Sequence, residues 1–318
     1  MFTNNTDLSL PLQLFMVHSD YDHISDAAYI SATSLLKPTK ATILGMRIKN
    51  RDIDALDLVA SSVGTASHDR LEKAFLNGNH IINMKKLGYS NDVIKNMRIN
   101  PEIVEDFHTP VYLERRSIKS FKNWQIGGKF DFVFSGMVRD LKTTKVFSYM
   151  KQEFEDYRIQ LSIYKWLNPD IITDPYGAID FIFTDWKAFE VGTKTNYPAQ
   201  PALSIKILLM TDAEVEIWLD EKLSNLEKYV NSAQINIPDC TNKELWQDPP
   251  KYAYFKNASA KRATKVFDNY AEAQSRLLTD GSVGKIDTRL GTPKRCNYCF
   301  KADCEQAQNY ILEGVLEA

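Results

Sequence analysis

Two carboxylates and a lysine at strand spacing are the residues of this chain best suited to chemistry. Asp140 and Lys142 are two positions apart, so on an extended strand their side chains project from the same face. Asp131 precedes them in what reads as the neighbouring strand of a hairpin turned at Ser135-Gly136. Carboxylates that converge offer the oxygen ligands that Mg²⁺ or Mn²⁺ prefers, and the Leu141 carbonyl is a natural third ligand.

This grouping predicts metal-assisted hydrolysis of a phosphodiester. An ion held by Asp131 and Asp140 can activate water and neutralise the leaving oxygen, while Lys142 orients the water and stabilises charge on the phosphate. An Asp-x-Lys pattern is short, and taken alone it is typical of a surface ion pair. The Gly128-x-x-Asp131 segment before it favours the catalytic interpretation.

Two further pairs lie at helical spacing. His68 and Glu72 share one face of a predicted helix, as do Gln160 and Tyr164. His68 can add a metal ligand, and the second pair can bind phosphate, orient the water or stack on a base. Each pair in isolation is more typical of an ordinary helix face. Glu114, in the strand before the hairpin, can brace a metal-bound water or face solvent, and we leave it outside the predicted site.

Taken in order, these patterns resemble the RecB-like branch of the PD-(D/E)XK nucleases. The four motifs are Gly-x-x-x-His-x-x-x-Glu, Gly-x-x-Asp, Asp-x-Lys and Gln-x-x-x-Tyr, spread over residues 64 to 164. The stretch Ser31-Ala-Thr-Ser-Leu-Leu also resembles standalone nucleases carried by phages. The resemblance implies an active site made of His68, Asp131, Asp140 and Lys142. It also implies two assisting residues on a later helix, Gln160 and Tyr164.

The order of predicted elements indicates an α/β core with a mixed sheet wrapped by helical additions. The resemblance refines this to a restriction-endonuclease-like core: a central mixed β-sheet flanked by helices, with a helical N-terminal addition and a cysteine-stapled C-terminal region. We expect one composite domain in three parts: residues 1–108, which are helical and carry the His motif; residues 109–234, the nuclease core; and residues 235–318, a basic region with a cysteine metal centre.

Particular elements follow from local pattern. The most specific is a capping box at Thr211 and Glu214 that begins a long helix. We also expect helical residues 51–77, broken at Gly64-Thr65, a single strand over 124–134, a hairpin strand over 138–144, a helix over 151–167, strands over 177–184, 202–210 and 252–256, and a helix over 268–278.

The chain has four cysteines, and three of them fall within nine residues: Cys296, Cys299 and Cys304, with Cys240 upstream. In a reducing compartment such a cluster favours metal ligation over disulfides. Four thiolates hold Zn²⁺ or ligate a [4Fe–4S] cluster, and spacing alone does not separate the two. The resemblance favours iron–sulfur, because several RecB-like nucleases end in a similar cysteine pattern. Their fourth cysteine, however, lies upstream of the nuclease motifs, whereas Cys240 lies downstream. Four unrelated buried thiols are the remaining alternative.

Composition excludes some classes of protein. The chain has 318 residues, a net charge of −2 and 44% hydrophobic residues, which is ordinary for a globular protein. No apolar run approaches the roughly 20 residues of a membrane span, and the first residues lack the cations of a secretion signal. We therefore expect a cytoplasmic protein, or a phage-encoded one acting in the host cytoplasm, without membrane partners.

Positive charge is concentrated near the C-terminus. Residues 251–301 carry 11 Lys and Arg against 4 Asp and Glu, a local net charge of +7. A solvated surface explains this charge as well as a phosphate-contacting patch does. On the second interpretation the residues expected to bind DNA are Lys261, Arg262, Lys265, Lys294 and Arg295.

The sequence therefore predicts an Mg²⁺- or Mn²⁺-dependent deoxyribonuclease, with an exonuclease favoured, acting in recombination, repair or phage DNA processing. No Walker A pattern is present, so the chain has no motor of its own, although it can partner a helicase or a strand-annealing protein and can form a homo-oligomer. The alternatives are a structure-specific endonuclease, a non-catalytic DNA-binding protein on a nuclease fold, and a zinc-organised interaction protein that uses the cysteine tail alone.

Overall fold

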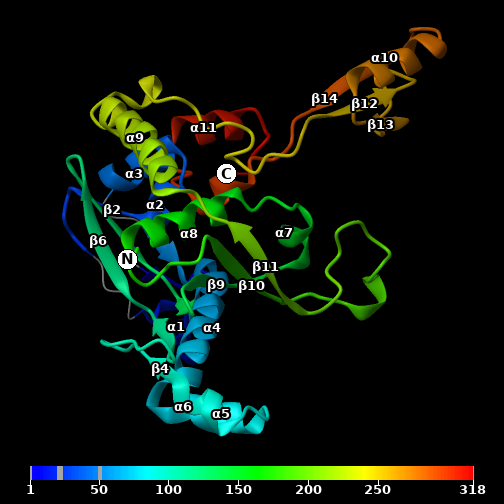
Figure 1. The fold of residues 1–318 in the computed structure, drawn as a ribbon. Helices are drawn as coiled ribbons and strands as arrows, with labels where there is room; N and C mark the ends of the chain where they lie inside the picture. The colour runs from blue at the N-terminus through cyan, green and yellow to red at the C-terminus, as the bar shows by residue number, and fades with distance from the viewer. Residues whose placement is uncertain (1, 20–23, 49–51, 318) are drawn as a thin grey trace. The chain divides into compact units, whose positions relative to one another are not determined.

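The computed structural model describes residues 2–19, 24–48 and 52–317. The chain divides into two compact units, the first made of residues 1–36 and 50–221 and the second of residues 37–49 and 222–318 (Figure 1). The boundary falls inside helix α9 (Asp212–Tyr229). Within the described ranges, no helix combines the length and apolar character that a membrane span requires.

A six-stranded mixed sheet forms the centre of the first unit, which confirms the expected mixed α/β class. Its strand order is β11-β10-β9-β8-β5-β4, and only the β9–β10 and β4–β5 pairs are parallel. The strands are β4 (Met97–Ile99), β5 (Thr109–Leu113), β8 (Phe132–Phe134), β9 (Met137–Thr144), β10 (Tyr176–Phe183) and β11 (Ala202–Leu208).

The predicted hairpin is confirmed as β8 and β9. Its turn places Ser135 at φ 48° and Gly136 at φ 81°, two left-handed residues in succession as a tight hairpin turn requires. Glycine at the second position also answers a steric need, since a Cβ there would lie 2.3 Å from Thr173 Oγ1. The turn therefore sets the register that carries Asp140 and Lys142.

The single strand expected over residues 124–134 is wrong. The chain bends at Phe130–Asp131, so that β7 (Trp124–Lys129) pairs with β2 (Tyr29–Ser31) and β6 (Arg116–Phe121) in a separate three-stranded sheet. The partner strand breaks at the same level, between β5 and β6, where Glu114 adopts φ 49°. Two backbone bonds span this junction: Glu114 N–H donates to Asp131 O at 3.1 Å and Phe130 N–H to Arg115 O at 3.3 Å. The β5–β6 and β7–β8 segments thus pass between the six-stranded and the three-stranded sheet at the same level.

Helix α4 (Val59–Phe75) carries the His motif, and the break expected at Gly64-Thr65 is absent from it. The space around Gly64 is open, and a helix tolerates one interior glycine at a cost of about 1 kcal/mol. The other N-terminal elements of the first unit are short: β1 (Phe2–Thr3), α1 (Leu10–Val17), α2 (Ala32–Leu35), β3 (Ile53–Asp54), α5 (Asn79–Lys86) and α6 (Asn91–Asn96).

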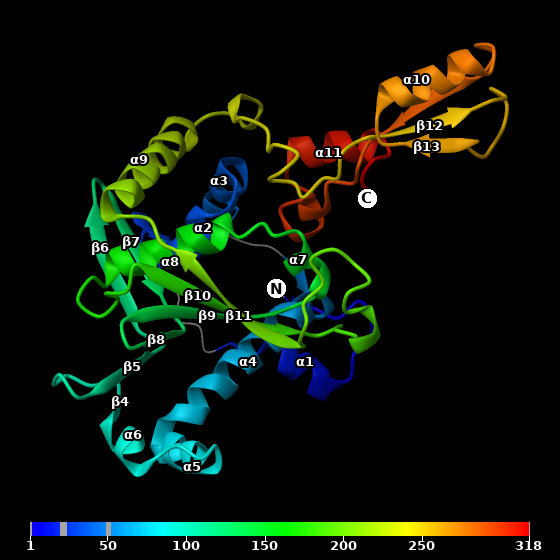
Figure 2. The ribbon, with the colours of Figure 1, turned by 45° about the vertical axis from the view of Figure 1, so that its right-hand side comes forward.

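Helix α8 (Glu155–Leu167) packs against β7, β9 and β10 (Figure 2) and begins four residues later than expected, after the short helix α7 (Val146–Met150). Its buried side chains include Leu161 and Ile163, both 0% exposed. Close approach depends on Gly128 and Gly177, where a Cβ would lie 2.8 Å from the Tyr164 ring and the Leu161 side chain respectively. Glycine in these strands therefore allows the helix to sit directly on the sheet.

The capping box before α9 is confirmed. Thr211 N–H donates to Glu214 Oε2 at 2.7 Å, and Glu214 N–H donates back to Thr211 Oγ1 at 3.3 Å. Of the five apolar positions that helical spacing predicts for this face, Val215, Leu219, Leu223 and Leu226 are buried, while Val230 lies just past the helix end and is half-buried.

The second unit has two parts of different character. Residues 251–289 form a small lobe, an antiparallel sheet of order β13-β12-β14 with helix α10 (Tyr270–Thr279) packed on it around Tyr254, Phe267 and Ala273. The expected strand and helix here are confirmed as β12 (Lys251–Phe255) and α10, while β13 (Lys265–Phe267) and β14 (Lys285–Arg289) were not anticipated. The other part packs α3 (Thr39–Arg47) and α11 (Glu305–Leu312) around a core that includes Leu44, Leu245, Cys296 and Cys304.

Candidate active site and cysteine pocket

The junction between the two sheets of the first unit gathers three residues that could hold a cation. A ligand atom of each of His68, Glu114 and Asp131 lies within 4.8 Å of the others. His68 comes from α4, which contacts β9, while Glu114 and Asp131 occupy the two strand breaks described above. One imidazole and two carboxylates form a donor set suited to a divalent ion such as Mg²⁺ or Mn²⁺.

Asp131 is oriented by two donors. Its Oδ2 accepts the Leu141 N–H at 3.0 Å and lies 3.1 Å from His68 Nδ1. The hydrogen bond to Asp131 raises the pKa of His68, although burial of the ring opposes the shift. Because Nδ1 faces the carboxylate, a neutral His68 that donates from Nδ1 would keep its Nε2 lone pair for a metal. Leu141 contributes its N–H to the site, and metal ligation through its carbonyl stays a prediction.

Asp140 and Lys142 pair beside this group, as their spacing predicts. Lys142 Nζ lies 2.6 Å from Asp140 Oδ2, and the Asp140 side chain is only 3% exposed. Burial raises the pKa of Asp140 to about 6, against the lowering effect of the Lys142 ammonium. Burial alone would lower the pKa of Lys142, but the Asp140 carboxylate outweighs it and the pKa is raised. The lysine is therefore held charged against a buried carboxyl that gains a proton easily.

Glu114 belongs to this group, although the sequence placed it outside the predicted site. Its Oε2 lies 2.6 Å from Lys129 Nζ, and burial raises its pKa although the lysine opposes this. The only signal in the sequence was a glutamate in the strand before the hairpin, which fits a solvent-facing position equally well. Pairing of the two broken strands, a long-range feature, brings Glu114 across from Asp131.

Gln160 and Tyr164 bond to each other. Gln160 Nε2 donates to Tyr164 Oη at 2.8 Å, and both side chains are buried between α8 and the strands below it. The Tyr164 ring fills the space above Gly128. This packing accounts for both residues, and their assistance in the reaction stays a prediction. Tyr157, one to two turns earlier on α8, was not anticipated, and its ring centroid lies 5.7 Å from Lys142 Nζ.

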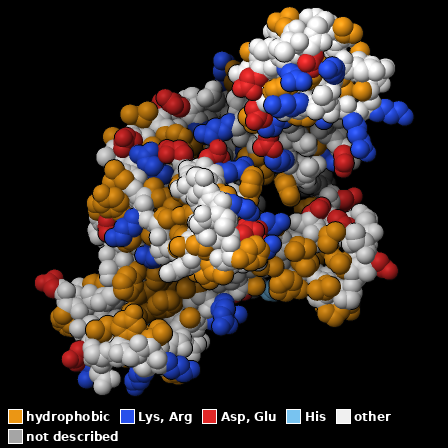
Figure 3. Space-filling view, turned by 90° about the vertical axis from the view of Figure 1, so that its right-hand side faces the viewer, with side chains coloured by type: hydrophobic (Ala, Val, Ile, Leu, Met, Phe, Trp, Pro, Cys, Tyr) orange, Lys and Arg blue, Asp and Glu red, His pale blue; other side chains and the backbone are white. Residues whose placement is uncertain are grey.

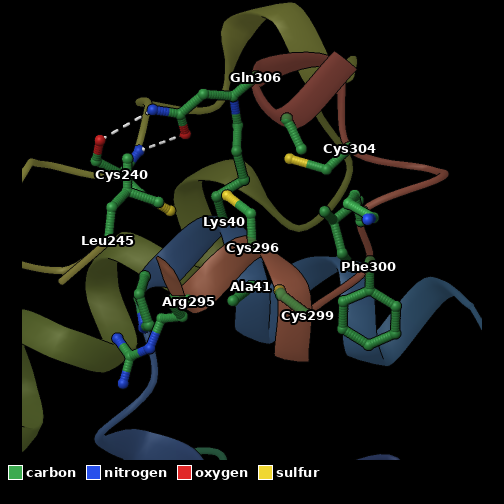
Figure 4. Close-up of a pocket in the computed structure, with 14 residues that line it drawn as sticks. Lys40, Ala41, Cys240, Leu245, Arg295, Cys296, Cys299, Phe300, Cys304 and Gln306 are labelled. Atoms are coloured by element: carbon green, nitrogen blue, oxygen red, sulfur yellow. Dashed lines mark hydrogen bonds between the residues drawn. The ribbon is translucent and has the colours of Figure 1, made fainter. Parts of the chain in front are cut away.

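All four cysteines line one pocket of the second unit, together with Lys40 from α3 and Gln306 from α11 (Figure 4). None of the four forms a disulfide, and the sulfur atoms of Cys240, Cys296 and Cys304 turn toward a common space. Burial raises the pKa of Cys240 to about 12 and that of Cys296 to about 11. Within the described chain, which includes all four cysteines, no three of the sulfurs lie within 4.8 Å of one another.

The five cations expected to bind DNA divide into two groups. Lys261, Arg262 and Lys265 are exposed on the β12–β13 hairpin of the lobe. Lys294 instead pairs with Asp248 at 2.6 Å. Arg295 stacks 4.5 Å from the Trp246 ring centroid and donates to the Glu244 carbonyl. On the face shown in Figure 3, Lys and Arg side chains are interspersed with Asp and Glu side chains.

Comparison with known proteins gives a structural likeness but no match by sequence. No family model matches the chain, and no curated protein matches it. Among solved structures, the chain is similar to one described as "Crystal structure of SSO0001", with 16% sequence identity and a TM-score of 0.42, over 69% of this chain and 91% of that chain.

Proposed function

We propose that this protein is an Mg²⁺- or Mn²⁺-dependent deoxyribonuclease of the PD-(D/E)XK type, with an exonuclease favoured. One observation carries the proposal: His68, Glu114 and Asp131 converge beside the Asp140–Lys142 pair, although these residues come from four separate segments of the chain. An aspartate on an ordinary solvated surface would stay exposed to water, whereas Asp140 is buried next to this group. Perturbed carboxyls that converge with a lysine are typical of catalytic sites.

The residues divide the work as follows. His68, Glu114, Asp131 and Asp140 would hold the divalent ion, which when bound supplies the charge that lowers the pKa of water and neutralises the leaving oxygen. Lys142, held charged by Asp140, would orient the attacking water and offset negative charge on the phosphate. The Leu141 N–H and His68 fix the direction of the Asp131 carboxylate, so little reorganisation is needed when substrate binds.

The finer fold assignment belongs to the same proposal. A restriction-endonuclease-like core is supported by the mixed central sheet, by the β8–β9 hairpin that carries the acidic residues, and by α8 packed on one face. The RecB-like order of motifs supports the exonuclease branch. Action on DNA in recombination, repair or phage DNA processing, a helicase or strand-annealing partner, a homo-oligomeric state and a cytoplasmic location complete the proposal.

We propose that the cysteine pocket holds a [4Fe–4S] cluster, with Zn²⁺ as the alternative. Four thiols from two distant segments line one space, which fits either group. The resemblance of the cysteine pattern to that of RecB-like nucleases favours the cluster over a single Zn²⁺ ion. Such a centre would join the Cys240 loop to the C-terminal segment and give the unit a structural anchor.

The deciding experiment is degradation of end-labelled linear DNA, single- and double-stranded, with Mg²⁺ or Mn²⁺. Wild type runs beside Asp140→Ala and Lys142→Ala, all checked for folding and for metal content. We expect degradation by wild type alone, while circular single-stranded and closed duplex DNA stay intact. Cleavage of the circles would favour the endonuclease alternative. An inactive wild type, or variants as active as wild type, would refute the catalytic assignment and favour a DNA-binding protein without catalysis.

A further inference from the structure

The loop that carries Cys240 is held by the side-chain amide of Gln306. Cys240 N–H donates to Gln306 Oε1 at 2.8 Å, and Gln306 Nε2 donates to Cys240 O at 2.9 Å (Figure 4). The amide therefore satisfies both backbone groups of one residue, as a neighbouring strand would. Two bonds in opposite directions fix the position of this residue and also its orientation.

A second buried side chain holds the preceding residue. Lys40 of α3 forms an ion pair with Asp239, although its own side chain is only 3% exposed. Apolar residues of similar volume would fill both positions without the cost of removing an amide and an ammonium from water. The Gln306 amide and the Lys40 ammonium are both removed from water, and both bind the Asp239–Cys240 dipeptide. Their desolvation cost indicates that this dipeptide must be held in one position, a requirement that packing alone does not explain.

Cys240 is the one cysteine whose position its own local chain cannot determine. The other three lie on a 3₁₀ turn (Lys294–Tyr298) and the segment leading into α11, within nine residues of one another. Cys240 lies 56 residues before Cys296 in the sequence. Gln306 follows Cys304 by two residues at the start of α11, so its amide links the remote cysteine to the segment that carries the other three.

We infer that Gln306 is the positioning residue that makes Cys240 the fourth ligand of the metal centre, with the Lys40–Asp239 pair in support. This inference rests on the proposed cysteine centre. If Gln306 served only to anchor a loop, its loss would lower stability whether or not Cys240 binds metal. If it acts through Cys240, its loss should change the metal centre itself.

The test compares Gln306→Glu with the matched control Gln308→Glu in the full chain, purified without oxygen. Gln308 lies on the same helix and donates to the Lys301 carbonyl at 2.8 Å, so this control loses a comparable bond without touching Cys240. The readouts are iron, zinc and acid-labile sulfide per chain, the visible absorption and electron paramagnetic resonance spectra, and the rate of metal release to a chelator. We expect Gln306→Glu to release metal roughly 10- to 100-fold faster than wild type, with spectra of a centre bound by three protein thiolates.

A double-mutant cycle separates a purely structural role of Gln306, anchoring the loop, from its role in positioning Cys240 as a ligand. In a Cys240→Ala background, Gln306→Glu should add nothing further to the release rate, since both changes remove the same ligand. Additive effects, or a folded Gln306→Glu protein with wild-type metal content and release rate, would overturn the inference alone. A wild type that holds neither iron nor zinc, before and after anaerobic reconstitution, would overturn the cysteine centre and this inference with it.

Discussion

Glu114 and Asp131 lie opposite each other at matched strand breaks, where the Glu114 N–H donates to the Asp131 carbonyl at 3.1 Å. Their carboxylates reach within 4.8 Å of each other and of His68. The backbone bond holds the two residues in register, so the carboxylate pair is built into the junction of the two sheets rather than left to side-chain freedom.

Glu114→Gln should therefore weaken divalent-ion binding, because it removes one of the two charges at this junction. We expect the Mg²⁺ concentration for half-maximal DNA degradation to rise by about 10- to 100-fold, with little loss of stability, since Lys129 is partly exposed and can be solvated. Titration of activity with Mg²⁺ measures the effect. Glu102→Gln, on an exposed loop, is the control. An unchanged Mg²⁺ requirement would remove Glu114 from the site.

Lys142→Met should abolish most of the turnover while the DNA still binds. Removal of one preorganised charge beside the reacting phosphate typically costs about 10²- to 10³-fold in kcat. The variant also leaves Asp140 buried beside an apolar side chain, so folding must be checked by circular dichroism. Lys142→Arg keeps the charge and should recover part of the rate. Wild-type kcat in a folded Lys142→Met protein would contradict the assigned role.

In metal-free protein, the contribution of Asp140 to stability should fall as the pH rises through the acidic range. Burial raises the pKa of Asp140 from 3.8 to about 6, so the folded state binds the proton more tightly than the unfolded state. The part of the free energy of unfolding that Asp140 contributes therefore decreases between about pH 4 and pH 6. His68 acts in the same direction at higher pH, because its pKa is raised by Asp131 and its stabilising charge is lost as the pH passes that pKa.

Urea unfolding in the presence of a chelator, at several pH values across this range, measures the dependence. Asp140→Asn has no titrating proton at this position, so the stability of wild type relative to this variant should fall between about pH 4 and pH 6. Equal slopes for the two proteins would show that Asp140 titrates normally.

The exposed cations of the β12–β13 hairpin should contact DNA phosphates. Lys261→Ala combined with Arg262→Ala is expected to weaken DNA binding and to reduce the slope of log affinity against log salt by about 2, at roughly 0.9 per duplex phosphate contact. Arg295→Ala is the contrasting variant. Arg295 stacks on Trp246, so its loss should lower stability and leave the salt slope unchanged. The reverse pattern would place the DNA contacts outside the lobe.

Two glycines of the sequence motifs should respond oppositely to alanine. Gly128→Ala places a Cβ 2.8 Å from the Tyr164 ring, so the ring must move, at a typical cost of about 1–3 kcal/mol. Gly64 lies inside α4 with open space around it, so Gly64→Ala should stabilise the protein by about 0.5–1 kcal/mol. Denaturant unfolding measures both changes. Destabilisation by Gly64→Ala would mean that something besides helix geometry requires this glycine.

The amino-acid sequence by itself determined the features that depend on near neighbours. The Ser135-Gly136 turn, the shared face of Asp140 and Lys142 and the capping box of α9 all follow from spacings of two or three residues. Period and turn chemistry act over such short distances, so each of these features could be predicted and each is present.

Tertiary structure decided the features that depend on distant segments. The strand break at Asp131 exists because β7 and β8 find partners in different sheets, and it is what brings Glu114 into the acidic group. Gln306 forms hydrogen bonds with Cys240, which lies 66 residues earlier in the sequence. Arg295 stacks on Trp246, 49 positions earlier, and so is separated from the exposed cations of the basic segment. A local pattern carries no information about which remote partner a side chain will find, because that choice is made by the packing of the whole unit.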